Sequence, residues 1–359
     1  MNYPIRVLQV VSIMNYGGLE NFIMNVYRNI DRDKIQFDFL VNKEGKGKFD
    51  DEIISMGGRI YKISSFSPYN YFSYVKKLDA FFKQMNYGVI HSHINSSSAI
   101  VLAVAKKNNI KIRISHSHID REGGNYKFLK KILKNFVNKN ATIKLACDED
   151  AGKWLFKKNF NVVRNAIDTT KFEFDKLKAD SVKRILNINS GELSFIHVGR
   201  FDPQKNHKFL IEIFEGLVKY NKSFKLFLVG EGQLKNQIID LVKQKKLENN
   251  VFFLGARNDV HILLQGMDYF LMPSLYEGLP ITLIEAQASG IRIFASNTIS
   301  KNVNLTNNMF FLDINDKESF IKCIIDNLKY ERYNTKELLV DKNYDIKDLV
   351  NYLEKIYLI

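Results

Sequence analysis

Short apolar runs with the character of β-strands alternate with amphipathic helical patterns along the chain. In the first half such runs are centred on Val7, Phe37, Ile60, Val89 and Ile112, with helical patterns at 19–30 and 71–85. The second half repeats the alternation, with strand-like runs at 194–198, 225–229, 251–254, 269–272 and 291–295. Such alternation is typical of parallel sheets covered by helices. The sequence therefore predicts the α/β class, with two doubly wound domains.

Length and local composition also favour two domains. The 359 residues, 45% of them hydrophobic, are about twice a common domain size and can fill two cores. The stretch 165–191 is polar, rich in Lys and Asp, and has little strand character. We place the boundary near residue 170, which predicts a first domain over 1–170 and a second over 171–344. The last segment, 345–359, is expected to be helical.

The charge balance favours anionic partners. Lys and Arg number 53 against 39 Asp and Glu, a net charge of +14, which suits nucleotides, lipid headgroups or nucleic acid. Nucleic acid ranks last, because no helix-turn-helix, zinc-finger or RNP pattern accompanies the charge. The cysteines, Cys147 and Cys323, are too few for a disulfide scaffold or a zinc site and are expected to be reduced thiols.

The start of the chain and its hydropathy predict a cytoplasmic location. Residues 1–4 lead directly into the strand-like run 5–11, without the apolar core and cleavage site of a secretory signal. No window approaches the ~18–20 uncharged apolar residues that a membrane-spanning helix needs. Any membrane contact is therefore expected to be peripheral.

Two carboxylates, Glu277 and Glu285, stand on either side of a predicted turn into a helix. The apolar run 267–272 is typical of a buried strand, 278–280 of a tight turn, and 281–289 of a helix. Free backbone N–H groups at such a helix start attract anions such as phosphates. The carboxylates can accept hydrogen bonds from hydroxyls on different parts of one elongated molecule, such as a nucleotide-sugar. Taken alone, such a pair is more often a solvated helix face than a ligand site.

A second phrase, His-Val-Gly-Arg-Phe-Asp-Pro-Gln-Lys-Asn at 197–206, lies upstream of the carboxylates. Together with 273–286 it resembles the retaining glycosyltransferases of family 4. These have the GT-B fold, in which two doubly wound Rossmann-like domains face each other across a cleft. In that family the first Glu contacts the donor sugar hydroxyls, the second contacts the ribose, and the Arg and Lys hold the diphosphate. The resemblance assigns these roles to Glu277, Glu285, Arg200 and Lys205.

Further donor contacts are expected at glycine turns and at the predicted helix start. Glycines let the backbone approach a phosphate or sugar closely, although the G-x-G-x-x-G spacing of a dinucleotide site is absent. The family uses such turns near the nucleotide, and ordinary turn or loop roles are the alternative. The additional donor-binding residues are Gly17, Gly18, Gly230, Gly255, Arg257, Gly278, Leu279 and Thr282.

Histidines concentrate in two phrases at the ends of predicted strands, 90–93 and 115–118. A metal site is disfavoured, because no Cys or suitable acidic ligand accompanies them and the HExxH spacing is missing. We therefore expect no metal or other cofactor. The resemblance implies a catalytic His in the acceptor site, facing the donor sugar, and His118 aligns best with it. His93 and His116 are expected on the acceptor side, with a structural role as the alternative.

The lysine-rich stretch 126–139 is predicted to form an amphipathic helix, since apolar side chains recur there at helical spacing. Such a helix can lie on an anionic bilayer, where each basic residue contributes ~1 kcal/mol. Packing of its apolar stripe on the first domain is the alternative. Because a basic acceptor-side helix recurs in relatives that modify lipid-linked sugars, we expect peripheral association with the inner face of the plasma membrane.

The whole chain, most closely at 143–156 and 296–300, resembles bacterial enzymes that build capsular polysaccharide or exopolysaccharide repeat units. The resemblance implies a retaining hexosyl- or N-acetylhexosaminyltransferase that uses an NDP-sugar, UDP rather than GDP, and a lipid-linked oligosaccharide acceptor. It assigns the acceptor to 1–170 and the donor to 171–344, with the helix of 345–359 crossing back to the first domain. A UDP-sugar epimerase of similar fold, or a non-catalytic partner of another glycosyltransferase, is the alternative.

Overall fold

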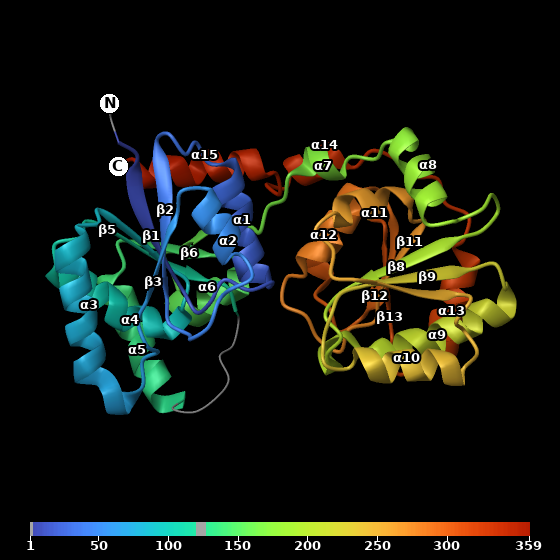
Figure 1. The fold of residues 1–359 in the computed structure, drawn as a ribbon, viewed down its shortest axis with the longest axis horizontal. Coiled ribbons are helices and arrows are strands. Elements are labelled where there is room, and N and C mark those ends of the chain that lie inside the picture. The colour runs from blue at the N-terminus through green and yellow to red at the C-terminus, as the bar shows by residue number, and fades with distance from the viewer. Residues whose placement is uncertain (1–2, 120–126) are drawn as a thin grey trace. The chain divides into compact units, whose positions relative to one another are not determined.

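The computed structural model describes residues 3–119 and 127–359. The chain divides into two compact units, one of Met1–Ala166 with Ile346–Ile359 and one of Ile167–Asp345. Each unit is built on a parallel sheet with helices on both faces (Figure 1). The expectation of two doubly wound α/β domains is therefore confirmed.

The sheet of the first unit, as far as the described residues form it, has seven strands in the order β3-β2-β1-β4-β5-β6-β7. They are β1 Ile5–Val11, β2 Ile35–Val41, β3 Arg59–Lys62, β4 Val89–Ser92, β5 Ile112–Ser117, β6 Ile143–Ala146 and β7 Asn161–Val162. The order reverses between β1 and β4, and ligands of open parallel sheets bind beyond the carboxyl ends of the strands at such a point.

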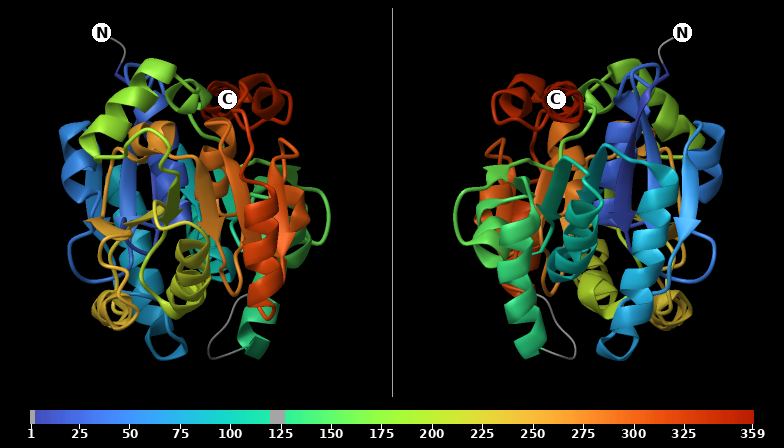
Figure 2. Two further views of the ribbon diagram at one scale, coloured as in Figure 1. Left: turned by 90° about the vertical axis from the view of Figure 1, so that its right-hand side faces the viewer. Right: turned by 90° about the vertical axis from the view of Figure 1, so that its left-hand side faces the viewer.

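Helices cover both faces of this sheet. They are α1 Gly18–Asn29, α2 Asp50–Ser55, α3 Tyr71–Met85, α4 Ser98–Lys107, α5 Lys127–Asn140, α6 Glu149–Phe156 and α15 Ile346–Tyr357. Because side chains alternate along a strand, residues such as Val7 and Ile114 pack under α1, α2 and α15. Leu8 and Ile90 face the opposite way, towards α3 and α4. Helices α3, α4 and α5 stand in front of the sheet in the right-hand view of Figure 2.

The sheet of the second unit has six strands in the order β10-β9-β8-β11-β12-β13, all within the described part of the chain. They are β8 Ser194–Val198, β9 Lys225–Val229, β10 Val251–Gly255, β11 Tyr269–Met272, β12 Arg292–Ser296 and β13 Met309–Leu312. Here the order reverses between β8 and β11. The sites of both units are therefore expected at equivalent positions of their sheets.

The helices of the second unit also divide between two faces. They are α7 Thr169–Phe172, α8 Lys176–Ile185, α9 His207–Tyr220, α10 Lys235–Gln244, α11 Val260–Gly266, α12 Ile281–Ala288, α13 Lys317–Asp326 and α14 Lys336–Val340. One apolar cluster joins α8, α11 and α12 to the sheet, through residues such as Val182, Leu264 and Ile284. The other joins α9, α10 and α13, through residues such as Phe214 and Ile238.

The predicted elements around the sites correspond closely to the observed ones. The helix predicted at 281–289 is α12, and the strand predicted at 267–272 is the shorter β11, because Met267 instead ends α11 as its C-cap. The predicted basic helix is α5; residue 126 lies outside the described residues. Within those residues no helix has the length and apolar content needed to cross a bilayer.

Candidate functional site

The candidate site of the second unit forms where β8 and β11 end. These paired parallel strands deliver the segments 199–205 and 273–278 to one edge of the sheet. There the predicted residues Lys205 and Glu277 meet. Lys205 Nζ lies 2.6 Å from Glu277 Oε1, and the two side chains are only 14% and 6% exposed. Such a buried pair persists only when its remaining polar atoms are also satisfied.

Gln204 satisfies the second oxygen of the Glu277 carboxylate. Its Nε2 donates to Glu277 Oε2 at 3.2 Å and to the Tyr276 carbonyl at 3.0 Å. The Leu275 amide donates in return to the Gln204 carbonyl at 2.8 Å. Gln204 thus ties the loop after β8 to the loop after β11. Sequence reasoning missed it, although it lies inside the phrase at 197–206 that supplied Arg200 and Lys205.

The 3-10 turn Pro203–Lys205 aims Lys205 at Glu277. Asp202 caps this turn, with Oδ1 accepting from the Lys205 amide at 3.3 Å, and Asn206 follows with a left-handed φ of 54°. Asn tolerates that conformation better than most residues. Arg200 is placed differently: its side chain is 70% exposed, and its nearest acidic partner is Asp202 at 3.4 Å. Arg200 therefore lies beside the buried pair with a guanidinium that faces solvent.

Glu285 lies on α12 with a half-buried side chain. Its carboxylate has no hydrogen-bond or ion-pair partner among the described residues. Burial raises its pKa from the ordinary value of 4.5 to about 7. Because the folded-state pKa lies above the unfolded one, ionisation costs stability as the pH rises from 4.5 to 7. A carboxylate held in this way is well suited to accept hydrogen bonds from a ligand.

The start of α12 provides backbone donors near these carboxylates. Pro280 is the N-cap and makes no side-chain cap hydrogen bond. The Leu283 amide donates to the Pro280 carbonyl at 3.0 Å, so the amides of Ile281 and Thr282 are the ones that lack an acceptor from a preceding turn. The predicted residues Leu279 and Thr282 are half-buried around this start. A Cβ added to Gly278 would meet nothing within 4 Å. The backbone at Gly278 is therefore open to a ligand.

Gly230 and Gly255 lie where β9 and β10 end, and the first is required by the packing. Gly230 has a φ of 145°, and a Cβ there would lie 2.0 Å from the Gly199 carbonyl oxygen. The Gly230 amide donates to the Gly255 carbonyl at 2.8 Å. Arg257, predicted near a base, is held by Asp259 through two hydrogen bonds of 2.8 and 2.6 Å. Its contact with a base stays a prediction.

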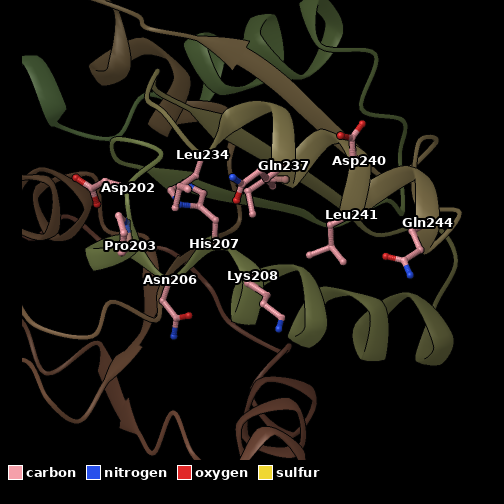
Figure 3. A pocket seen from close by; sticks show the side chains of 11 residues that line it. Asp202, Pro203, Asn206, His207, Lys208, Leu234, Gln237, Asp240, Leu241 and Gln244 are labelled. Carbon is pink, nitrogen blue, oxygen red and sulfur yellow. The ribbon is translucent and has the colours of Figure 1, made fainter.

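A pocket of about 570 Å³ lies on the far side of the Asp202–Asn206 turn (Figure 3). Its walls are the start of α9 and the length of α10, with Asp202, Asn206, Lys208, Gln237 and Asp240 among its lining residues. Asp202, Pro203 and Asn206 of the turn line this pocket, whereas Gln204, Lys205 and Glu277 do not. The pocket is therefore a separate feature of the second unit.

In the first unit the predicted pair Gly17 and Gly18 lies between β1 and α1. Gly17 is the N-cap of α1 in extended backbone, and a Cβ there would lie 2.3 Å from Glu20 Oε2. A Cβ on Gly18 would meet nothing within 4 Å. Gly17 thus gives room to Glu20, whereas Gly18 leaves an open backbone at the carboxyl edge of the sheet. Their contact with a donor stays a prediction.

Four histidines meet where β4 and β5 end in the first unit. His91 Nε2 lies 3.2 Å from His116 Nδ1, and His93 Nδ1 lies 2.9 Å from His118 Nε2. The rings of His91 and His93 have centroids 4.2 Å apart and are tilted by 30°, and those of His116 and His118 have centroids 4.1 Å apart and are tilted by 33°. The structure therefore brings the three predicted residues His93, His116 and His118 together.

Burial keeps these four imidazoles neutral at physiological pH. It lowers the pKa of His91 and of His118 to about 3, with the charge of His118 adding to the effect on His91. Burial, reinforced by the neighbouring histidines, lowers the pKa of His93 and His116 well below the ordinary range.

His91, His93 and His116 carry ring nitrogens within 4.8 Å of one another, a spacing at which a metal ion could be held. Of the six ring nitrogens of these three residues, however, all but His116 Nε2 already lie at hydrogen-bond distance from another group. The arrangement therefore fits a hydrogen-bond network better than a metal centre, and the absence of a metal stays a prediction.

Helix α5 divides its apolar residues between the core and the surface. Val137 is fully buried and Leu133 packs against the first unit. Phe128, Ile132 and Phe136, four residues apart, are 77%, 38% and 49% exposed. The apolar pattern therefore supplies both a packed face and an exposed apolar stripe.

We expect Gly230→Ala to destabilise the fold, because its Cβ would collide with the Gly199 carbonyl in a strained conformation. The free energy of unfolding should fall by about 2–4 kcal/mol. Gly278→Ala is the matched control, since its Cβ meets open space, and it should leave stability within about 0.5 kcal/mol. Urea denaturation of both variants measures the difference; equal stabilities would contradict the assigned role of Gly230.

Two family models match the chain, "Glycosyltransferase Family 4" over 16–171 and "Glycosyl transferases group 1" over 178–340. The putative glycosyltransferase EpsF of Bacillus subtilis is 35% identical over 310 residues, 83% of this chain and 81% of EpsF. The capsular polysaccharide biosynthesis glycosyltransferase CapH of Staphylococcus aureus is 29% identical over 367 residues, 99% of both chains.

A further relative acts on a named lipid-linked substrate. The Escherichia coli UDP-Gal:alpha-D-GlcNAc-diphosphoundecaprenol alpha-1,3-galactosyltransferase is 27% identical over 259 residues, 68% of this chain and 67% of that enzyme. Among solved structures, Anabaena HepE in complex with UDP has a TM-score of 0.79 at 15% identity, covering 98% of this chain and 99% of HepE. This likeness confirms the GT-B fold. The two family models and the EpsF similarity show that the chain belongs to the family 4, group 1 glycosyltransferases.

Proposed function

We propose that this glycosyltransferase moves a hexosyl or N-acetylhexosaminyl group from a UDP-sugar to a lipid-linked oligosaccharide, with retention of configuration, in the synthesis of a bacterial surface polysaccharide. The names of three similar proteins support the components of this reaction. CapH is a capsular polysaccharide enzyme, the E. coli relative uses UDP-Gal and a diphosphoundecaprenol acceptor, and HepE was solved with UDP.

The buried contact between Lys205 and Glu277 is the observation that carries the proposal. Both oxygens of Glu277 already have a donor, yet a carboxylate offers about four lone-pair sites, so it can also accept from sugar hydroxyls. The ammonium group of Lys205 is held at a fixed position beside this carboxylate. The pair would therefore orient a sugar and place a positive charge near its phosphate at the same time.

Cleavage of the bond between the sugar and the diphosphate leaves positive charge on the sugar and negative charge on the leaving group. Lys205 and the first-turn amides of α12 offset the negative charge from fixed positions. Arg200 can swing from solvent and contribute a planar fork of N–H donors. Glu277 orients the sugar without attacking it, and Glu285 accepts from the ribose hydroxyls. In a retaining reaction without a protein nucleophile, the leaving phosphate helps to deprotonate the acceptor.

The acceptor is assigned to the first unit, through the edge where β4 and β5 end. His118 and His116 each hold one ring nitrogen without a partner among the described residues. Neutral imidazoles of this kind can bind sugar hydroxyls as donors or acceptors. His93 supports His118 through the hydrogen bond between His93 Nδ1 and His118 Nε2.

Helix α5 is proposed to rest on the anionic inner face of the plasma membrane. Its exposed stripe of Phe128, Ile132 and Phe136 would enter the headgroup region, and the exposed Lys131 and Lys139 would contact lipid phosphates. A lipid-linked acceptor lies in the membrane, so a surface-bound enzyme meets it at high local concentration.

The central test measures sugar transfer to a lipid-diphosphate-sugar acceptor with a panel of NDP-sugars. Transfer should occur with one UDP-sugar, and Glu277→Ala should reduce kcat/KM by at least about 100-fold, because the sugar loses its orienting carboxylate. Glu248→Ala, at an exposed turn, is the control and should match the unaltered chain. Isomerisation of a UDP-sugar without acceptor would establish an epimerase, and binding without turnover a non-catalytic partner.

Donor binding should depend on pH through Glu285. Its ionised carboxylate accepts hydrogen bonds from the ribose hydroxyls. With a pKa of about 7, Glu285 is mostly protonated at pH 6 and mostly ionised at pH 8. Affinity for the intact UDP-sugar should therefore rise about tenfold from pH 6 to pH 8. Glu285→Gln should bind more weakly at pH 8 and lose this dependence. Calorimetry with the UDP-sugar rather than UDP avoids titration of a terminal phosphate; a pH-independent affinity of the unaltered chain would refute the assignment.

Membrane association is tested by co-sedimentation with vesicles of phosphatidylcholine, with and without phosphatidylglycerol. We expect binding to the anionic vesicles that weakens with salt and falls at least about tenfold in Phe128→Ser/Phe136→Ser. Tyr220→Ser, another exposed aromatic on α9, is the control. An unchanged vesicle affinity of the double variant would contradict the proposed contact between α5 and the membrane.

A further inference from the structure

The four histidines of the first unit are linked to two residues outside their own strands. The Tyr357 hydroxyl, at the end of α15, lies 2.7 Å from His91 Nδ1. Gln9 Oε1, on β1, lies 2.9 Å from His93 Nε2. Neither residue was predicted from the sequence. Tyr357 begins a series of hydrogen bonds through His91 to His116, and Gln9 begins a second series through His93 to His118.

Strand register explains why these side chains meet. Gln9 of β1 lies directly opposite His91 of β4, and alternation places His93 on the same face. That face is covered by α1 and α15, so Tyr357 reaches the histidines from above the sheet. Phe22 of α1 packs on the rings of His116 and His118, with centroid distances of 5.2 and 5.5 Å. The rings are thereby held against rotation.

Each series of hydrogen bonds ends on a ring nitrogen that has no partner in the described part of the protein. These atoms are His116 Nε2 and His118 Nδ1, both buried. A neutral imidazole carries one N–H and one lone pair, so the partner at one nitrogen decides what the other can offer. The direction of the hydrogen bonds along each chain therefore sets the chemistry of its end.

The chain from Gln9 can be followed atom by atom. The amide oxygen of Gln9 accepts, so His93 Nε2 must carry the proton and His93 Nδ1 the lone pair. His118 Nε2 then donates to that lone pair. A neutral His118 consequently holds its own lone pair at Nδ1.

The chain from Tyr357 runs with the opposite result. Burial raises the pKa of Tyr357, so the phenol keeps its proton, and a buried hydroxyl proton needs an acceptor. The phenol proton then goes to His91 Nδ1, His91 Nε2 donates to His116 Nδ1, and His116 carries its N–H at Nε2.

We propose that Gln9 and Tyr357 are positioning residues that fix the tautomers of the acceptor-side histidines, so that His118 presents a lone pair and His116 presents an N–H. Their ring centroids lie 4.1 Å apart. One sugar hydroxyl can use both, donating its proton to His118 Nδ1 and accepting from His116 Nε2. Two lone pairs would compete for the single hydroxyl proton, and two N–H groups would leave that proton without an acceptor. The proposal rests on the proposed binding of the acceptor by this unit.

The direct test is tautomer assignment by long-range 1H–15N correlation on the full chain labelled with 15N-histidine, at pH 7. We expect both His118 and His116 to be protonated at Nε2 and unprotonated at Nδ1. The reverse tautomer in either ring, or a doubly protonated ring, would overturn the proposal. This readout needs no substrate, so it stands apart from the test of transferase activity.

A second test uses Tyr357→Phe, which keeps the buried ring and removes only the hydroxyl. His91 and His116 should then populate both tautomers, while His118 keeps its own. Acceptor kcat/KM should fall at least about tenfold and the Kd of the UDP-sugar should stay within twofold. Tyr352→Phe is the matched control, because this tyrosine of the same helix bonds Asn161 instead, and it should behave as the unaltered chain.

The outcomes separate the two proposals. An unchanged His116 tautomer in Tyr357→Phe, or an equal loss of acceptor kcat/KM in Tyr352→Phe, would overturn the role of Tyr357. Absence of transfer by the unaltered chain with the expected tautomers present would instead refute the proposed function and with it the hydroxyl contact.

Discussion

Parallel strands bring all their carboxyl ends to one edge of a sheet, and this constraint decides where chemistry can occur in each unit. At the reversal between β8 and β11 the edge holds Lys205 and Glu277, which are far apart in sequence. At the reversal between β1 and β4 it holds Gln9 and the histidines. The same topology therefore positions two unlike sets of side chains at equivalent places.

The two edges solve the problem of buried polar groups in opposite ways. In the second unit, the buried Lys205 is paired with Glu277, whereas the guanidinium of Arg200 faces solvent. In the first unit, the imidazoles are kept neutral by burial and are linked to one another, to Gln9 and to Tyr357. A charged edge suits a diphosphate, whereas a neutral, directional edge suits sugar hydroxyls. This division agrees with the proposed assignment of donor and acceptor.

Glu285 shows how a resemblance and a physical observation complement each other. The resemblance predicts a ribose contact at this position, but only the structure shows a half-buried carboxylate without a partner in the described residues and with a pKa of about 7. Gln204 is the opposite case. It lies within the recognised phrase, yet its importance follows from contacts with Glu277 and Tyr276 that form only after folding.

The sequence by itself determined the alternation of strands and helices, the two-domain α/β class and the glycosyltransferase family, because periodicity and short motifs are local properties. It also selected Lys205, Glu277 and His118. The tertiary structure alone decided that Lys205 pairs with Glu277 and that Tyr357, near the end of the chain, reaches a histidine of β4. Pairing, burial and the direction of a hydrogen bond depend on neighbours that are distant along the chain, and these neighbours are chosen only when the sheets and their covering helices pack.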